Sequence, residues 1–125
     1  MNDVIPTYGV VVLSDKGEVL LVKHQEKAGH VTGTYGLPAG RATNDENDIQ
    51  TAQRELQEET GLTVEIDDLV RLPNVYVADI KRSDGSTKRM SIQCFLAKKV
   101  SGSIMPSSDE ETKGEWRAIE SLNSL

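Results

Sequence analysis

Cysteine, histidine and aromatic side chains are scarce in this chain: among 125 residues there are one Cys and two His, and 4% are aromatic. The single cysteine, Cys94, cannot form an internal disulfide, which suits a reducing cytoplasm. No run of 18 apolar residues occurs, so we expect no membrane-spanning helix. The start, MNDVIPTYG, lacks the basic and apolar segments of a secretory signal, and we therefore expect a cytoplasmic protein.

An excess of basic residues is absent too. The chain has 20 acidic and 14 basic residues, a net charge of −6. This charge argues against binding to long nucleic acid, because such binding depends on neutralising phosphates. A small phosphorylated ligand is compatible with it if a metal ion supplies positive charge. The length predicts one domain over residues 1–125 and leaves both a monomer and a homodimer open.

What the sequence does have is a concentration of carboxylates within residues 40–62. If residues 47–60 form a helix, its apolar stripe falls within ~80° at ~100° per residue. That stripe consists of Ile49, Ala52, Leu56 and Thr60. Glu55, Glu58 and Glu59 share a neighbouring face at i, i+3 and i+4, where like charges repel. Three oxygen donors on one face suit Mg²⁺ or Mn²⁺; the alternative is a solvated helix with incidental ion pairs.

Both ends of this helix are marked in the sequence. Asn47 is a good N-cap, and Gln50 three residues later gives a weaker form of the capping box. Gly61 can adopt the left-handed conformation that closes a helix. Arg54 lies at i, i+4 with Glu58, so it can hold a carboxylate in a fixed orientation.

The rest of the chain has the patterns of strands and turns. Strands are predicted at 8–13, 19–22, 62–66, 69–78, 90–97 and 116–119. The first two are expected to form an antiparallel hairpin around residues 14–17, and a second hairpin is expected to turn at Asp84-Gly85. Residues 23–33 and 101–114 are predicted loops, and 120–125 begin a terminal helix. Strands, one central helix, more strands and a final helix predict an α+β domain.

The segment at 40–62 resembles the signature of the Nudix family, G-x5-E-x7-R-E-U-x-E-E-x-G-U, where U is a bulky aliphatic residue. Every specified position matches. The matching residues are Gly40, Glu46, Arg54, Glu55, Leu56, Glu58, Glu59, Gly61 and Leu62. The preceding YGLPAG is similar to the family's W-x-L-P-G-G, with Tyr35 in place of Trp and Ala39 in place of Gly.

This resemblance implies a Nudix fold, a mixed β-sheet sandwiched between α-helices, with the metal site on the predicted helix. Metal ligands would be Glu55, Glu58 and Glu59, and the backbone at Gly40 would approach the metal or a phosphate. Among the catalytic residues, Arg54 would orient the carboxylates, Glu58 would bind the metal, and Glu55 is our choice of general base. Glu46 would support the site from outside the metal ligands, or else it is a solvated loop acid.

Nudix enzymes often take a further acid from a loop outside the signature. Asp109-Glu110-Glu111 is the obvious donor here, with Glu110 favoured as a metal ligand and Glu111 next. The alternative is an acidic, solvated loop.

The activity implied is hydrolysis of the pyrophosphate bond in a nucleoside diphosphate linked to another group. Water is the favoured attacking group, because no plausible Ser or Cys nucleophile is present. Tyr35 and Tyr76 are candidates for substrate stacking, together with Phe95 and Trp116, although each also suits a core. Three basic residues are candidates for contacts with terminal phosphates, although each also suits an ordinary surface position: Lys23, Lys88 and Arg89. Two alternatives stay open: a non-catalytic Nudix-fold module that binds a nucleotide or protein, and an acidic metal-buffering or interaction protein.

Overall fold

The computed structural model describes residues 4–24, 35–43, 45–81, 84–104 and 112–118. The strands of the first part are β1 (Ile5–Val12), β2 (Glu18–His24), β3 (Tyr35–Gly36) and β4 (Ala39–Gly40). The helix α1 (Asp48–Thr60) follows, then a short 3-10 helix, η2 (Ile66–Asp68). The long strands β5 (Leu69–Lys81) and β6 (Thr87–Ala97) and the strand β7 (Thr112–Ala118) complete the described chain.

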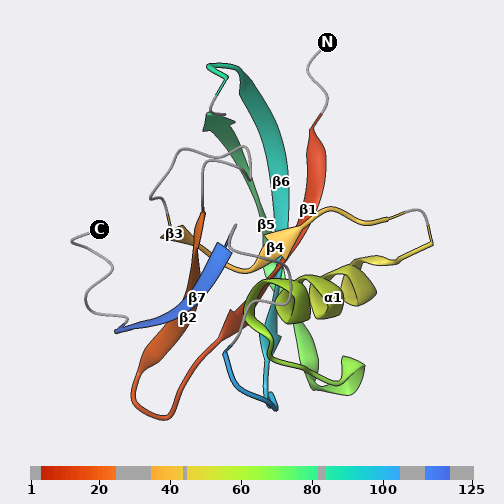
Figure 1. Ribbon diagram of the computed structural model, residues 1–125. Coiled ribbons are helices and arrows are strands. Elements are labelled where there is room, and N and C mark those ends of the chain that lie inside the picture. The colour runs from red at the N-terminus through yellow and green to blue at the C-terminus, as the bar shows by residue number, and fades with distance from the viewer. Residues whose placement is uncertain (1–3, 25–34, 44, 82–83, 105–111, 119–125) are drawn as a thin grey trace.

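The strands form two sheets (Figure 1). One has four strands in the order β4-β1-β6-β5, with β1 and β6 parallel and the other pairs antiparallel. The second has the order β3-β2-β7 and is antiparallel. A mixed sheet with a helix packed on it confirms the predicted α+β class. The predicted terminal helix at 120–125 lies outside the described residues. Among the residues that the structure describes, α1 is the only α-helix packed on the sheet.

The predicted hairpin of the first two strands is wrong. The turn itself is present, with Gly17 at a φ of 77° and the Ser14 amide donating to Glu18 O at 2.8 Å. Only one bridge, between Leu13 and Val19, joins the two arms. β1 instead pairs with β4 and β6, whereas β2 pairs with β3 and β7 in the second sheet.

The predicted strand at 62–66 is also wrong, although its alternation was correct. Leu62 and Val64 are buried while Thr63 and Glu65 are exposed. Only Thr63 forms a bridge, with Ser101, and the chain then turns into η2. The alternation of polar and apolar residues therefore predicted correctly which side chains are buried, although this segment does not pair with another strand in a β-ladder.

The hairpin of β5 and β6 is confirmed, with Gly85 at a φ of 90° in its turn. The expected break at Pro73-Asn74 is a β-bulge, a register shift between Arg71 and Val75. The side-chain amide of Gln93 donates to Leu72 O at 2.8 Å and so satisfies a carbonyl that the bulge takes out of the ladder.

The core lies between α1 and the four-stranded sheet. Its buried cluster is Val10, Val12, Leu20, Ala52, Leu56, Leu62, Val64, Leu69, Phe95 and Ala97. Arg71 of β5 ties the start of the helix to the sheet, because it forms an ion pair with Asp48 and lies over the ring of Phe95, 5.0 Å from its centroid. The helix position beside the sheet is thus set by apolar packing and one lateral ion pair.

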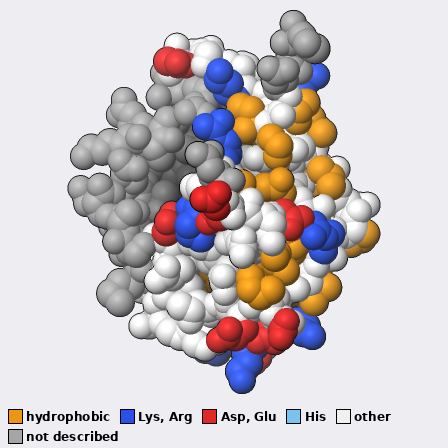
Figure 2. Space-filling view, turned by 90° about the vertical axis from the view of Figure 1, so that its right-hand side faces the viewer, with side chains coloured by type: hydrophobic (Ala, Val, Ile, Leu, Met, Phe, Trp, Pro, Cys, Tyr) orange, Lys and Arg blue, Asp and Glu red, His pale blue; other side chains and the backbone are white. Residues whose placement is uncertain are grey.

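Two surface properties complete the description. None of the described helices is long and apolar enough to cross a membrane. Figure 2 shows hydrophobic side chains along one face, interspersed with charged side chains of both signs. Exposed large hydrophobic residues occur on the edge strand β5, where Val75, Tyr76 and Val77 are each more than half exposed.

Candidate active site

The caps of α1 hold the carboxylate face in place. The Gln50 amide donates to Asn47 Oδ1 at 2.9 Å, and the Asn47 amide donates to Gln50 Oε1 at 3.0 Å. This reciprocal pair is the predicted capping box. At the other end, Gly61 has a φ of 85° and its amide donates to Gln57 O at 2.9 Å. Both predicted ends are therefore confirmed. The helix begins at Asp48, directly after the N-cap Asn47 and two residues after the loop acid Glu46.

Arg54 is the centre of the charged cluster. Its Nε lies 2.5 Å from Glu46 Oε2, and its Nη2 donates to Glu46 Oε1 at 3.0 Å. Its Nη1 bonds Glu55 Oε2 at 3.1 Å and Glu58 Oε1 at 2.9 Å. The remaining Nη2 bond reaches the carbonyl of Arg41 at 3.0 Å. The five N–H donors of a guanidinium are thereby matched to five bonds, which orients three carboxylates from one point.

Glu46 is therefore part of the cluster and not a solvated acid. Hydrogen bonds from Arg54 first, and then from the Thr43 amide, lower its pKa to about 2. The pKa of Arg54 is raised by the same pair. Although Glu46 precedes the helix in a loop, it is fixed in its ionised form against Arg54.

Glu55 and Glu59 form a carboxylate pair beside β4. Glu59 Oε1 accepts a hydrogen bond from the Ala39 amide at 3.0 Å. Burial raises the pKa of both groups; for Glu59 burial and then the neighbouring charge of Glu55 raise it to about 9. Without a cation, a pair of this kind retains a proton that one isolated carboxylate would release.

Gly40 is required by the approach of Glu55. A Cβ atom at residue 40 would lie 2.0 Å from Glu55 Oε2, far inside contact distance. The absence of a side chain at residue 40 therefore lets a carboxylate touch the β4 backbone. The expectation that the backbone at Gly40 approaches a metal or a phosphate stays a prediction.

The donor set fits a divalent cation, although it is not a ready-made cage. Within the described residues, no three acidic, His or Cys side chains converge as a metal-binding group. Mg²⁺ usually keeps several waters and takes one or two carboxylates together with substrate phosphates. The pair of Glu55 and Glu59 meets that requirement, because a cation would remove their mutual repulsion. Glu58, held by Arg54, is the adjacent third oxygen donor.

Other predicted site residues are not brought together with this cluster. Tyr76 is 58% exposed on β5. The order β4-β1-β6-β5 puts it at the opposite sheet edge from Gly40, about 14 Å away at ~4.8 Å per strand. Of Tyr35 the structure describes the backbone in β3, and Glu110 with its acidic neighbours lies outside the described residues.

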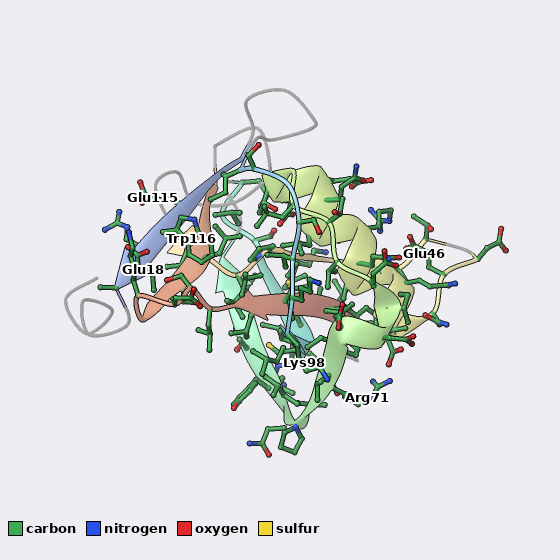
Figure 3. The ribbon with its side chains drawn as sticks, turned by 90° about the horizontal axis from the view of Figure 1, so that it is seen from below. Glu18, Glu46, Arg71, Lys98, Glu115 and Trp116 are labelled. Atoms are coloured by element: carbon green, nitrogen blue, oxygen red, sulfur yellow. The ribbon has the colours of Figure 1, made fainter. Side chains whose placement is uncertain are left out.

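The remaining aromatic and charged candidates have structural surroundings. Phe95 is fully buried, and Trp116 packs partly buried against the core. Glu115 pairs with Arg117 at 2.7 Å. Figure 3 shows Glu115 and Trp116 on the opposite side of the molecule from Glu46. Arg89 pairs with Asp79 at 2.9 Å on the surface.

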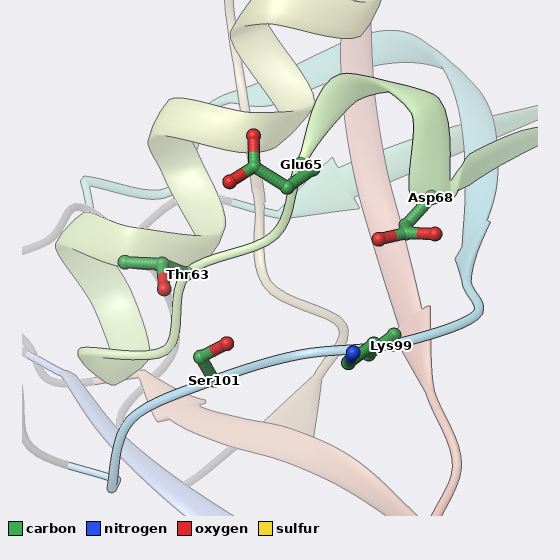
Figure 4. Close-up of a pocket in the computed structure, with 5 residues that line it drawn as sticks. All are labelled: Thr63, Glu65, Asp68, Lys99 and Ser101. Carbon is green, nitrogen blue, oxygen red and sulfur yellow. The ribbon is translucent and has the colours of Figure 1, made fainter.

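A polar hollow lies apart from the cluster, beyond the end of α1 (Figure 4). It has a volume of about 190 Å³ and is lined by Thr63, Glu65, Asp68, Lys99 and Ser101. None of these residues belongs to the carboxylate face. Its walls are held by the backbone bridge between Thr63 and Ser101, with N···O distances of 2.9 Å in both directions.

Sequence reasoning missed three groups that hold the site. The Ala39 amide binds Glu59, the Arg41 carbonyl accepts from Arg54, and the buried hydroxyl of Thr51 lies 3.1 Å from Glu46 Oε1. The two backbone groups left no trace in residue type. The threonine did, because a β-branched hydroxyl residue inside a helix is a reason to search for a hydrogen-bond partner.

Known proteins resemble this chain over most of its length. The oxidized purine nucleoside triphosphate hydrolase of Danio rerio is 31% identical over 113 residues, covering 90% of this chain and 66% of that protein. The 8-oxo-dGDP phosphatase NUDT18 of Mus musculus is 31% identical over 103 residues, covering 82% of this chain and 28% of that protein. The chain spans from about a fifth to about two thirds of the length of the curated relatives it matches.

Solved structures share the fold. The MutT NUDIX hydrolase from Burkholderia pseudomallei superimposes with a TM-score of 0.74 at 24% identity, covering 95% of this chain and 86% of that one. The NUDIX domain of Shewanella oneidensis NrtR, solved with ADP ribose, gives a TM-score of 0.74 at 20% identity, covering 100% and 79%.

The family model for the NUDIX domain matches residues 4–125, which include both sheets and the whole charged cluster. With that match and the shared fold, the chain belongs to the Nudix hydrolase family.

Proposed function

We propose that the chain is a divalent-metal-dependent pyrophosphohydrolase acting on a nucleoside diphosphate linked to another group. The candidate substrates are nucleoside triphosphates, oxidised nucleotides, ADP-ribose and nucleotide sugars. The observation that carries this proposal is the half-buried pair of Glu55 and Glu59 against Gly40, oriented from one side by Arg54. Two relatives whose names state action on oxidised purine nucleotides support the class.

In this proposal Glu55, Glu58, Glu59 and the backbone at Gly40 hold Mg²⁺ or Mn²⁺, with Glu110 as a further ligand. When bound, the metal neutralises charge on phosphate oxygens and lowers the pKa of an attacking water. Glu55 acts as the general base. Arg54 holds Glu55 and Glu58 through its Nη1 atom, so these carboxylates keep one orientation as charge develops on the substrate.

The residues expected from the sequence to contact the substrate are proposed here with the same roles. Tyr35 and Tyr76 are proposed base contacts, and Glu46 supports the site through Arg54. We also propose a cytoplasmic location, since Cys94 is buried as a free thiol. The state of assembly, monomer or homodimer, is measurable by light scattering after size exclusion.

The non-catalytic module is disfavoured, because such modules usually lose carboxylates of the signature and this chain retains all of them. A metal-buffering protein is disfavoured by the arrangement around Arg54, which a simple acidic surface does not need.

A panel assay tests the proposal. The purified protein is mixed with Mg²⁺ or Mn²⁺ and each substrate class, and released phosphate and pyrophosphate are measured. We expect turnover in the wild type and its loss in Glu58→Gln and Glu59→Gln, with the fold retained by circular dichroism. Glu65→Gln is the matched control. Glu65 lies after the end of α1, and its side chain makes no capping hydrogen bond to η2.

Wild-type turnover that survives unchanged in both site variants would refute the assigned roles. No hydrolysis of any substrate, combined with tight nucleotide binding, would favour the non-catalytic module.

A further inference from the structure

A buried threonine stands behind the Arg54 cluster. Thr51 is 0% exposed and is the fourth residue of α1, where a β-branched residue with a hydroxyl is a poor helix former. Its Oγ1 lies 3.1 Å from Glu46 Oε1 and 2.9 Å from the carbonyl of Asn47. A hydroxyl has one proton to donate, so these two acceptors compete for it.

The carboxylate is the stronger of the two acceptors. Asn47 O already accepts the Thr51 amide at 3.0 Å. Glu46 is paired with Arg54, and a charge-assisted bond is roughly twice as strong as a neutral one. A proton turned to Asn47 would also leave lone pairs of Thr51 and Glu46 facing each other at 3.1 Å. The hydroxyl therefore donates to Glu46.

This bond joins the loop acid to the body of the helix. Glu46 Oε1 also accepts from the Thr43 amide at 3.0 Å, but that donor belongs to an exposed loop. Thr51 is the fully buried donor to Glu46, and it sits one turn before Arg54 on the same helix. The carboxylate is thereby fixed relative to the helix that carries Arg54.

We propose that Thr51 is a positioning residue of this site: through Glu46 it fixes the Arg54 guanidinium, and through Arg54 the directions of Glu55 and Glu58. The kinetic part of this inference rests on the proposed hydrolase function. The structural part does not, since it concerns the order of the pair formed by Arg54 and Glu46.

Two substitutions separate the hydroxyl from the shape of the side chain. Thr51→Val keeps the branched shape and removes the donor, whereas Thr51→Ser keeps the donor. We expect Thr51→Val to lower kcat about tenfold, with KM little changed. This is the lower end of the loss of activity, about 10- to 100-fold, that follows from removing residues that hydrogen-bond to metal ligands. Thr51→Ser should restore most of the rate.

Thr7→Val is the matched control. Thr7 is also a buried threonine, 5% exposed, and its hydroxyl donates to Ser91 O at 2.7 Å on β6. We expect it to lower stability about as much as Thr51→Val while retaining wild-type kcat. An equal loss of rate in both variants would overturn the proposal, because general destabilisation would then explain it.

A second readout needs neither metal nor substrate. Exchange of the Arg54 Nε proton with water, measured by ¹H–¹⁵N NMR, reports the order of the pair with Glu46. We expect slow exchange in the wild type and Thr51→Ser, and at least several-fold faster exchange in Thr51→Val. If the wild type hydrolyses nothing, the proposed function fails while this measurement still decides the role of Thr51.

The third arm combines Thr51→Val with Glu46→Gln. If Thr51 acts through Glu46, the two losses of rate are not independent. The double variant should then have a kcat only slightly below that of Glu46→Gln alone. Losses that multiply, or unchanged exchange of the Arg54 Nε proton in Thr51→Val, would show that the hydroxyl serves the helix alone and would overturn the proposal.

Discussion

At the scale of single residues, the site depends on close approaches that tolerate little change. Arg54 uses its whole guanidinium, and Gly40 leaves no room for a side chain beside Glu55. Neighbouring carboxylates repel one another in this arrangement, and the hydrogen bonds of Arg54 hold them in fixed directions. Substitutions here should therefore affect function more than folding.

Arg54→Lys should lower kcat/KM about 10- to 100-fold, because an ammonium cannot bond Glu46 in two places and reach Glu55 and Glu58 as well. Steady-state kinetics on a substrate identified by the panel would measure this. Arg89→Lys is the control and should be neutral, because Arg89 forms only an exposed pair with Asp79 in the described structure and the lysine keeps the positive charge that a phosphate contact would need. Equal rates for both variants would contradict the role of Arg54.

Gly40→Ala should displace Glu55, because the added methyl group would overlap its carboxylate. We expect a loss of about 100-fold in kcat, as for a misplacement of ~1 Å at a reacting centre, and weaker Mn²⁺ binding by electron paramagnetic resonance. Gly17→Ala is the comparison: its φ of 77° makes the change strained, but no atom lies within 4 Å. It should lower stability and leave the rate intact.

At the scale of elements, α1 was predicted closely and several strands were not. The capping box and Gly61 are local signals, and they marked both ends correctly. The alternation at 62–66 was also local, yet it produced burial without a ladder, since pairing needs a partner strand that local sequence does not specify. Thr51 was missed because it lies outside the helix face that was predicted to be buried.

Asn47→Ala should lower the free energy of unfolding by about 1 kcal/mol, because the amides of the first turn lose an acceptor. Urea denaturation followed by circular dichroism would measure it. Asn74→Ala, at an exposed position in the bulge of β5, should change stability by less than about 0.5 kcal/mol. A silent Asn47→Ala would mean that packing alone holds the start of the helix.

At the scale of the whole molecule, two sheets and one described helix place β4 against α1 and separate β5 from the site. The four-stranded sheet puts Gly40 and Tyr76 at opposite edges, a separation that no local pattern expressed. The stability of the whole fold is also linked to the charge state of this site, because Glu59 is ionisable and half-buried.

Without metal, stability should fall as pH rises from about 4.5 toward 9. The pKa of Glu59 is raised to about 9 in the folded chain, by burial and then by Glu55, from its ordinary value of 4.5. Between these values the folded chain binds a proton that the unfolded chain has released, so raising the pH favours unfolding. Urea midpoints in chelator across this range would show the decline, and Glu59→Gln should flatten it.

Adding Mg²⁺ should raise the urea midpoint more at pH 8 than at pH 6, since the cation takes the place of that proton and stabilises the state that binds it. A midpoint that is independent of pH and metal in the wild type would contradict a cation site at this pair.

The sequence by itself determined the helix, its caps and the spacing of its glutamates, because i, i+3 and i+4 geometry and capping bonds act within a few residues. Only the tertiary structure decided that β1 and β2 enter different sheets, since β4 and β6 arrive from distant segments to occupy both edges of β1. It also brought Gly40 and the Ala39 amide to Glu55 and Glu59. Those contacts depend on how α1 packs against β4, and packing is a property of the assembled chain.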